Sequence, residues 1–241
     1  KAMRRSFDRR KGTSPLHVVS AFATQQGLTL AQRVVAEKSG EAEALSVLLE
    51  GLDLTGALIS LDALYARKTI ATKIVEHGAD YLIALKGNNK KDHTRVGEYF
   101  VRTTFGKIPD TPAVFDAFDE THGRLVRRRA FVTEDPDLIG ALNGWPALTK
   151  VIAVETITSV NHVHGGGRGK VFSDIRYFLT SATLDGPMLA ASVRNHWAIE
   201  NSLHWVLDMG FREDDCRVRD RNAAANLSVI RKIAINLVKA D

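Results

Sequence analysis

The amino-acid sequence predicts an α/β protein in which helices flank a mixed sheet. Along the first ninety residues, apolar runs alternate with amphipathic segments in the order hairpin, helix, strand, helix, strand. The run at 80–87, DYLIALKG, is apolar almost throughout, which is typical of a strand buried on both faces. The order therefore predicts a sheet with a parallel part, covered by helices.

The first elements follow from local signals. Two runs rich in β-branched residues, 16–25 and 28–37, predict a hairpin that turns at Gln26-Gly27. Ser39 or Gly40 is expected to cap the helix that follows, whose first turn is acidic.

The next strand begins after Gly56 and ends on Asp62. The amphipathic segment 66–78 predicts a helix that stops at Gly78, because glycine readily adopts the left-handed conformation that ends helices. A polar helix is expected from Lys90 to about Thr104.

Alternating segments then dominate the middle of the chain. Two hairpins are expected, one around His122-Gly123 and one around the glycine-rich stretch 161–169, so 107–182 is interpreted as a mostly antiparallel β insertion. Helical patterns return at 188–210, capped by Asp185, and at 223–240. Leu227, Ile230, Ile233, Ala234 and Leu237 are expected to form the apolar face of the last helix. The predicted division is 1–106, 107–182 and 183–241.

Composition limits the classes of protein. No stretch approaches the roughly 18 apolar residues that span a bilayer, and no signal-peptide pattern is recognised, so no membrane partner is expected. The single cysteine, Cys216, favours a reducing cytoplasm. Residues 1–11 hold six Lys or Arg against one acid, which equals the whole net charge of +5. This segment could contact phosphates, or it could be a solubilising disordered tail.

Two carboxylates are the first candidates for chemistry. Asp62 ends a strand, where α/β sheets build their sites, and a carboxylate there can hold a hard cation. A helix N-cap is the alternative interpretation. Glu200 shares a helical stripe with His196 and His204, which favours a functional face over a half-buried helix with aromatic anchors.

Basic side chains provide further candidates. In the run RLVRRRAF, strand alternation places Arg127 and Arg129 on one face and Arg128 on the other. One face could meet DNA phosphate, or the hairpin could be a plain exposed surface. The stretch GGGRG lacks the spacing of a phosphate-binding loop and is interpreted as a flexible turn.

Two long stretches resemble a known family, the H-repeat-associated group of DDE-type insertion-sequence transposases. ISLDALYARKTIATKIVEHGADYLIALKGNN is similar to its second-aspartate region, and VRNHWAIENSLHWVLDMGFREDDCRVRDRNAAANL to its glutamate region. The opening KAMRRSFDRRKG resembles the segment after the first catalytic aspartate, with Lys1 as the lysine of an Asp-Gly-Lys motif.

The resemblance implies a ribonuclease-H-like fold with a β insertion before the last catalytic helix, and with the first strand and first aspartate missing before Lys1. It implies catalysis by three carboxylates around two Mg²⁺ (or Mn²⁺) ions, of which Asp62 and Glu200 are the two present here. Double-stranded DNA is the expected partner of a homodimer, in the bacterial cytoplasm at the nucleoid. The expected DNA-binding residues are Arg4, Arg5, Lys86, Asn88, Arg127, Arg129, Arg194, His196 and Asn201.

The predicted function is therefore metal-dependent cleavage and strand transfer at the ends of an insertion sequence. Two alternatives stay open. One is a purely hydrolytic nuclease on the same fold, because a fold does not fix the reaction. The other is a truncated, inactive relic that only binds DNA, because the first aspartate is expected before Lys1.

Overall fold

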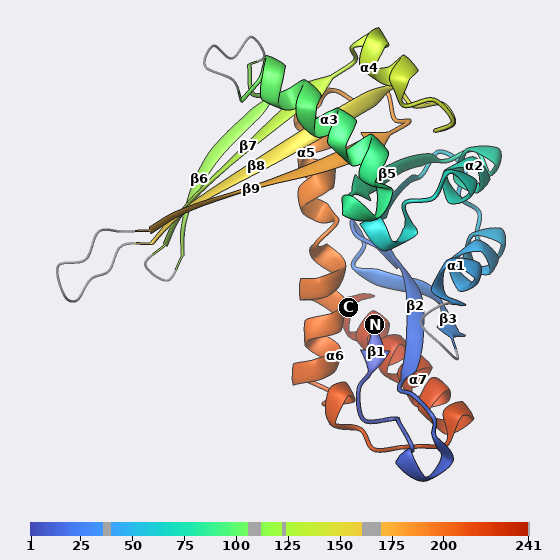
Figure 1. The fold of residues 1–241 in the computed structure, drawn as a ribbon. Coiled ribbons are helices and arrows are strands. Elements are labelled where there is room, and N and C mark those ends of the chain that lie inside the picture. Colours follow the sequence, from blue (N-terminus) through green and yellow to red (C-terminus); the bar gives the residue numbers. More distant parts are fainter. Residues whose placement is uncertain (36–39, 106–111, 122–123, 161–169, 241) are drawn as a thin grey trace. The chain divides into compact units, whose positions relative to one another are not determined.

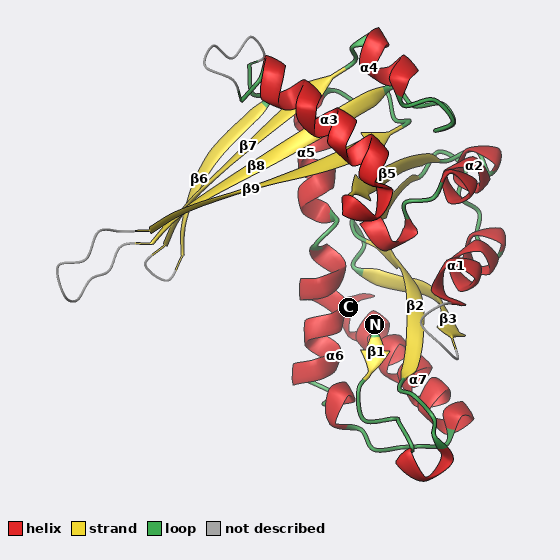
Figure 2. Ribbon diagram, viewed as in Figure 1, coloured by secondary structure: helices red, strands yellow, loops and turns green. Residues whose placement is uncertain are grey.

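The computed structural model describes residues 1–35, 40–105, 112–121, 124–160 and 170–240 (Figure 1). The chain divides into two compact units: unit 1 contains Lys1–Asp53 and Arg194–Asp241, and unit 2 contains Leu54–Val193. Each unit has its own sheet (Figure 2). Strands and helices alternate through the first half of the chain, so the α/β prediction is confirmed.

Unit 2 is built on a six-stranded mixed sheet with the order β4-β5-β9-β8-β7-β6. β4 and β5 are parallel, and β6 to β9 pair antiparallel, as predicted. β9 also pairs antiparallel with β5, which was not predicted. The turn at 122–123 and the glycine-rich loop at 161–169 lie outside the described residues. The strands are β4 (Leu58–Leu61), β5 (Asp80–Leu85), β6 (Phe115–Thr121), β7 (Arg124–Thr133), β8 (Lys150–Val160) and β9 (Lys170–Thr180).

Helices cover both faces of the sheet near β5. On one face, Tyr177 of β9 stacks on Phe100 of α3, with ring centroids 5.9 Å apart. On the other face, Phe178 clusters with Leu189 of α5. This two-sided cover explains why Tyr81 to Leu85 are all buried and why their sequence is apolar throughout. The helices of unit 2 are α2 (Lys68–Glu76), α3 (Lys90–Thr103), α4 (Pro136–Ala141) and most of α5 (Gly186–Asn195).

The units group the chain differently from the predicted division. Both expected boundaries, 106/107 and 182/183, fall inside unit 2. The reason is strand pairing: β9, the last strand of the insertion, forms an antiparallel ladder with β5. The insertion therefore continues the sheet that β4 and β5 begin.

Unit 1 contains a three-stranded antiparallel sheet with the order β1-β2-β3. Gly27 makes the predicted turn between β2 and β3, with a φ of 70° that favours glycine. Gly40 is the N-cap of α1, as expected, while Ser39 lies outside the described residues. The elements are β1 (Ala2–Met3), β2 (Leu16–Ala23), β3 (Leu28–Val35), α1 (Glu41–Glu50), α6 (Trp205–Met209) and α7 (Arg221–Ala240).

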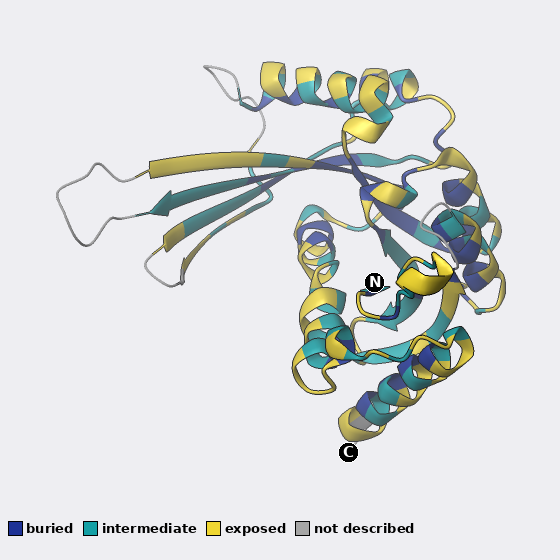
Figure 3. Cartoon of the chain, turned by 60° about the horizontal axis from the view of Figure 1, so that its bottom comes forward, coloured by how far each residue is buried: buried dark blue, intermediate teal, exposed yellow. Residues whose placement is uncertain are grey.

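The predicted inner face of α7 is wrong. Ile230, Ile233 and Leu237 are 51–66% exposed, while the buried side consists of Ala224, Ser228, Lys232 and Ile235. Figure 3 shows exposed and buried residues alternating along this helix. Small side chains at Ala224 and Ser228 let the helix approach the β2-β3 hairpin closely, and hydrogen bonds then outweigh hydropathy.

Two local features differ from the expected elements. The helix predicted through 188–210 is interrupted after α5, and a π-helical turn at Glu200–His204 precedes α6. The short helix α4 was not predicted, although its signals are present: Asp135 accepts hydrogen bonds from the amides of Asp137 and Leu138, and Pro136 follows it.

Candidate active site

Asp62 stands where the carboxyl ends of two parallel strands meet. It follows β4 directly, and Lys86 follows the neighbouring strand β5. The Asp62 Oδ1 atom accepts hydrogen bonds from the amide of Ala63, at 2.7 Å, and from the Lys86 ammonium, at 3.1 Å. The structure thus brings together two residues that were predicted to share this edge of the sheet.

The N-cap alternative for Asp62 is also correct in part. The side chain caps the short 3-10 turn Ala63–Tyr65, whereas Arg67 is the N-cap of α2. About half of the Asp62 and Lys86 side chains is exposed to solvent. An accessible carboxylate that already holds one cationic group can also hold a hard metal cation in its place.

Two asparagine side chains fix the backbone beside Asp62. Asn88 donates to the carbonyl of Ala63 at 2.6 Å, and Asn89 donates to the carbonyl of Ala66 at 2.8 Å. Asn88 was predicted as a DNA contact; in the structure its amide group holds the turn that carries the aspartate. Asn89 was not singled out, because its partner becomes apparent only when β4 and β5 are paired.

Glu200, in unit 1, opens the π-helical turn. Its Oε2 atom lies 3.1 Å from Nδ1 of His204, and 57% of its side chain is exposed. Leu203 and Leu207 lie in a buried cluster with Ile235 of α7, which anchors this part of the chain. Turns of this kind are frequent at functional sites, because the extra residue redirects side chains that a regular helix would stack.

His204 is mostly buried, and its electrostatics depend on Glu200. Burial lowers the pKa of His204, while the hydrogen bond with Glu200 raises it in part. The net effect is a lowered pKa of His204, which favours the neutral imidazole at neutral pH. A neutral imidazole leaves the Glu200 carboxylate with its full negative charge, which suits a cation ligand.

The other candidates around Glu200 are distributed over several turns. Arg194 lies in the last turn of α5 and is exposed, as is Asn201 in the π-helical turn. His196 lies in the interruption between them and contacts the ring of Trp197 edge-on, with centroids 5.8 Å apart.

Lys1 was not predicted as a functional side chain of this region. Its ammonium group forms ion pairs with Asp208 and with Asp214, the latter at 3.3 Å, and lies 3.9 Å from Glu213. Only 11% of the Lys1 side chain is exposed. The acidic run at 213–215 was the available signal, but two hundred residues separate it from Lys1.

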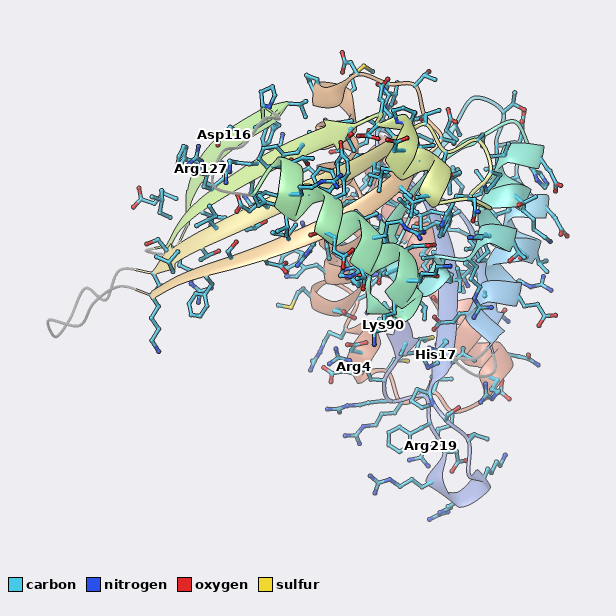
Figure 4. All side chains as sticks on the ribbon, turned by 45° about the horizontal axis from the view of Figure 1, so that its top comes forward. Arg4, His17, Lys90, Asp116, Arg127 and Arg219 are labelled. Carbon is cyan, nitrogen blue, oxygen red and sulfur yellow. The ribbon has the colours of Figure 1, made fainter. Side chains whose placement is uncertain are left out.

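The predicted arginines of the β insertion are paired with acids. Arg127 and Arg129 share one face, as alternation predicted. The Nε atom of Arg127 donates to Asp116 at 2.9 Å, and that of Arg129 donates to Glu155 at 2.7 Å. Arg127 and Asp116 are labelled in Figure 4. The Arg127 guanidinium holds the pKa of Asp116 below its usual range. These cross-strand pairs neutralise the local charge, so phosphate would have to compete with a carboxylate.

Arg4 and Arg5 are also paired, with Asp214 at 3.2 Å and Asp215 at 3.4 Å. The segment that holds them is ordered, with a strand, a 3-10 turn and a β-bridge between Asp8 and Thr13. The alternative of a disordered tail is therefore wrong for this segment.

The donor chemistry suits a hard cation, since Asp62 and Glu200 are exposed carboxylates. Within the described residues, no group of three or more His, Cys, Asp or Glu side chains is gathered in a form that could hold a metal ion. Asp62 belongs to unit 2 and Glu200 to unit 1.

Comparison with known proteins identifies the family. The family model described as "Transposase DDE domain" matches residues 1–237. The chain therefore belongs to the transposase DDE domain family, as the sequence motifs predicted.

Among its relatives, the chain is similar to "H repeat-associated putative transposase YhhI" of Escherichia coli (strain K12), with 36% identity over all of this chain and 63% of YhhI. It is similar to the same extent, with the same coverage, to "Putative protein YbfL" of that strain. The chain thus spans about 63% of the length of these relatives. A solved piggyBac transposase synaptic complex with hairpin DNA matches 92% of this chain and 40% of that protein, with 9% identity and a TM-score of 0.47. No helix in the described parts of the chain has the length and apolar character needed to cross a membrane.

Proposed function

We propose that this chain is the DNA-cleaving and strand-joining part of a transposase, and that Asp62 and Glu200 are its metal-binding carboxylates. The observation that best supports this is the placement of Asp62 at the adjoining ends of β4 and β5, within a chain that a transposase family model matches almost throughout. Ligands in α/β sheets bind at that edge.

Mg²⁺ or Mn²⁺ would be held by the carboxylate oxygens of Asp62 and Glu200, and two ions are expected. When bound, the ions would activate water or a DNA 3′-hydroxyl and stabilise the leaving oxygen. In unit 2, Lys86 would yield its place on Oδ1 of Asp62 and become available to a DNA phosphate. In unit 1, neutral His204 would hold one Glu200 oxygen by its hydrogen bond.

The partner is proposed to be double-stranded DNA, bound by a homodimer in the bacterial cytoplasm at the nucleoid. Of the basic and amide candidates, Lys86, Arg194 and Asn201 are exposed and are proposed to contact DNA. Arg4, Arg5 and Asn88 are exposed as well, but their side chains hold the fold through Asp214, Asp215 and the carbonyl of Ala63. His196, half-buried against Trp197, would instead orient its neighbours. Arg127 and Arg129 would contribute only after leaving their carboxylate partners.

Calorimetric titration with Mn²⁺ tests the metal-binding role. Asp62→Asn and Glu200→Gln should each weaken the binding of Mn²⁺ to the chain. The matched controls are Asp174→Asn and Glu134→Gln, which neutralise carboxylates that are at least as exposed and lie elsewhere in unit 2. Equal binding heats in all five proteins would overturn the assignment of both carboxylates.

A joining assay tests the reaction itself. The chain is incubated with Mn²⁺, a target plasmid and a labelled duplex that ends in a free 3′-hydroxyl. Transfer of the label to the plasmid is the expected result, and it should be lost in Asp62→Asn. Cleavage without joining would instead identify a hydrolytic nuclease.

A further inference from the structure

We infer that a basic surface of unit 1 binds the phosphates of duplex DNA, separately from the proposed metal-binding residues. The basic surface is defined by five exposed side chains from two segments that are about two hundred residues apart in the sequence. They are Arg9, Arg10, Lys11, Arg217 and Arg219.

The first segment is a short turn with a defined conformation. Asp8 is the N-cap of the 3-10 turn Arg9–Lys11, and Gly12 ends it in the left-handed conformation, with a φ of 64°. The buried hydroxyl of Ser6 accepts from the amide of Leu16 at 2.8 Å and thereby ties the base of the loop together. The three cationic side chains of the turn are therefore presented from a fixed backbone.

The second segment, which connects α6 and α7, is attached to this loop. Val218 packs on the cluster that contains Met3 and Leu16, so the neighbouring Arg217 and Arg219 are left facing solvent. Arg221 donates to the carbonyl of Ser14 at 3.4 Å. Figure 4 shows Arg219 beside the N-terminal loop. Two basic segments thus contribute to one surface.

The acids of this region are already engaged. Asp214 and Asp215 pair with Arg4 and Arg5, which hold the loop against the connecting segment. Asp220 accepts from the amide of Ala223 at the start of α7. Among the described residues, no ion pair neutralises the five cations of the basic surface.

The lack of ion pairs among the described residues distinguishes the basic surface from the arginines of the β insertion. Arg127, Arg128 and Arg129 each pair with a carboxylate, so phosphate would gain little by displacing it. At the basic surface, phosphate replaces only water and counterions, and release of counterions from DNA is what drives such binding. The choice of DNA as the polyanion rests on the proposed function.

Fluorescence anisotropy with a labelled random-sequence DNA duplex, in EDTA, tests the inference. The first variant is Arg9→Gln/Arg10→Gln/Lys11→Gln, and the second is Arg217→Gln/Arg219→Gln. The control, Arg102→Gln/Arg124→Gln/Lys170→Gln, removes three exposed positive charges from unit 2. Circular dichroism checks that each variant remains folded, and five exposed substitutions in two separate variants make a common folding failure improbable.

The salt dependence of DNA binding gives the expected size of the loss in the variants. Each phosphate contact contributes about 0.9 to the slope of log affinity against log salt, so the triple variant should lower its magnitude by up to about 2.7. Affinity at 0.1 M salt should fall at least about tenfold in both basic-surface variants and much less in the control. A control that loses as much affinity would show that only net charge matters, and would overturn the inference. Wild type that does not bind the duplex would overturn it as well.

The test is independent of metal chemistry, because EDTA removes divalent ions. If the basic-surface variants lose DNA binding while Asp62→Asn and Glu200→Gln leave Mn²⁺ binding unchanged, the inference stands and the metal-binding proposal fails. If instead the basic-surface variants bind DNA as wild type does, while Asp62→Asn and Glu200→Gln lose Mn²⁺ binding, the metal-binding proposal stands and the basic surface is refuted.

Discussion

Lys232 offers a quantitative test of the packing in unit 1. It lies on α7, only 5% exposed, and its ammonium group donates to Gln32 and, at 3.1 Å, to the hydroxyl of Ser228. Burial lowers the pKa of Lys232 from 10.5 to about 8; the charge of Glu213 opposes this shift, and that of Lys1 adds to it. The substitution Lys232→Met keeps the approximate length of the side chain and removes the amine that takes up and releases the proton.

The free energy of unfolding depends on pH because Lys232 has a lower pKa in the folded chain than in the unfolded chain. Below pH 8 both folded and unfolded chains hold the proton, so the folded state bears the full cost of a buried charge. Between pH 8 and 10.5 the folded chain releases the proton while the unfolded chain keeps it, and stability rises with pH. Each pH unit in this window corresponds to about 1.36 kcal/mol, so the total gain is about 3 kcal/mol.

The assay is urea unfolding followed by circular dichroism at intervals from pH 7 to 10.5. The free energy of unfolding of wild type minus that of Lys232→Met should increase by about 3 kcal/mol across this range. Lys239→Met, which removes an exposed lysine of the same helix, controls for general alkaline effects. A difference that is flat or falls with pH would refute the burial of a charged Lys232.

Three further predictions concern single contacts. Arg129→Ala should destabilise the fold by about 3 kcal/mol in urea, because Glu155 is only 8% exposed and would lose its partner; a loss below about 1 kcal/mol would show that the pair is solvated. Phe100→Ala should cost about 3–5 kcal/mol in the same assay, since Phe100 is fully buried, and an unchanged midpoint would contradict its packing between α3 and the sheet. In Glu200→Gln, the pKa of His204 from an NMR titration should fall further, because Glu200 raises it; an increase would rule out the observed hydrogen bond.

Much of the fold could be predicted from local patterns. The continuous apolar run of β5 indicated a strand covered on both faces, and Gly27 and Gly78 marked a turn and a helix end. The closeness of Asp62 and Lys86 was also predictable, because parallel neighbouring strands end at the same edge. These features depend on residues close together in the sequence or on general rules of chain topology.

The inner face of α7 could not be predicted in this way. Hydropathy favoured Ile230 and Leu237, yet the structure buries Lys232. The partners that make this tolerable, Gln32 and Ser228, include a residue two hundred positions away. The hydropathy pattern of one helix cannot reveal a hydrogen bond to a strand that is distant in the sequence.

The sequence by itself determined the α/β class, the β insertion, the family, and Asp62 and Glu200 as candidate ligands. Only the tertiary structure decided which basic side chains, among the residues that it describes, face solvent without an acidic partner. Arg127 and Arg129 looked like a phosphate surface, but strand register places Asp116 and Glu155 within hydrogen-bonding reach of them. Local periodicity fixes the face on which a charge lies, whereas its effective sign and strength depend on the groups that distant segments bring beside it.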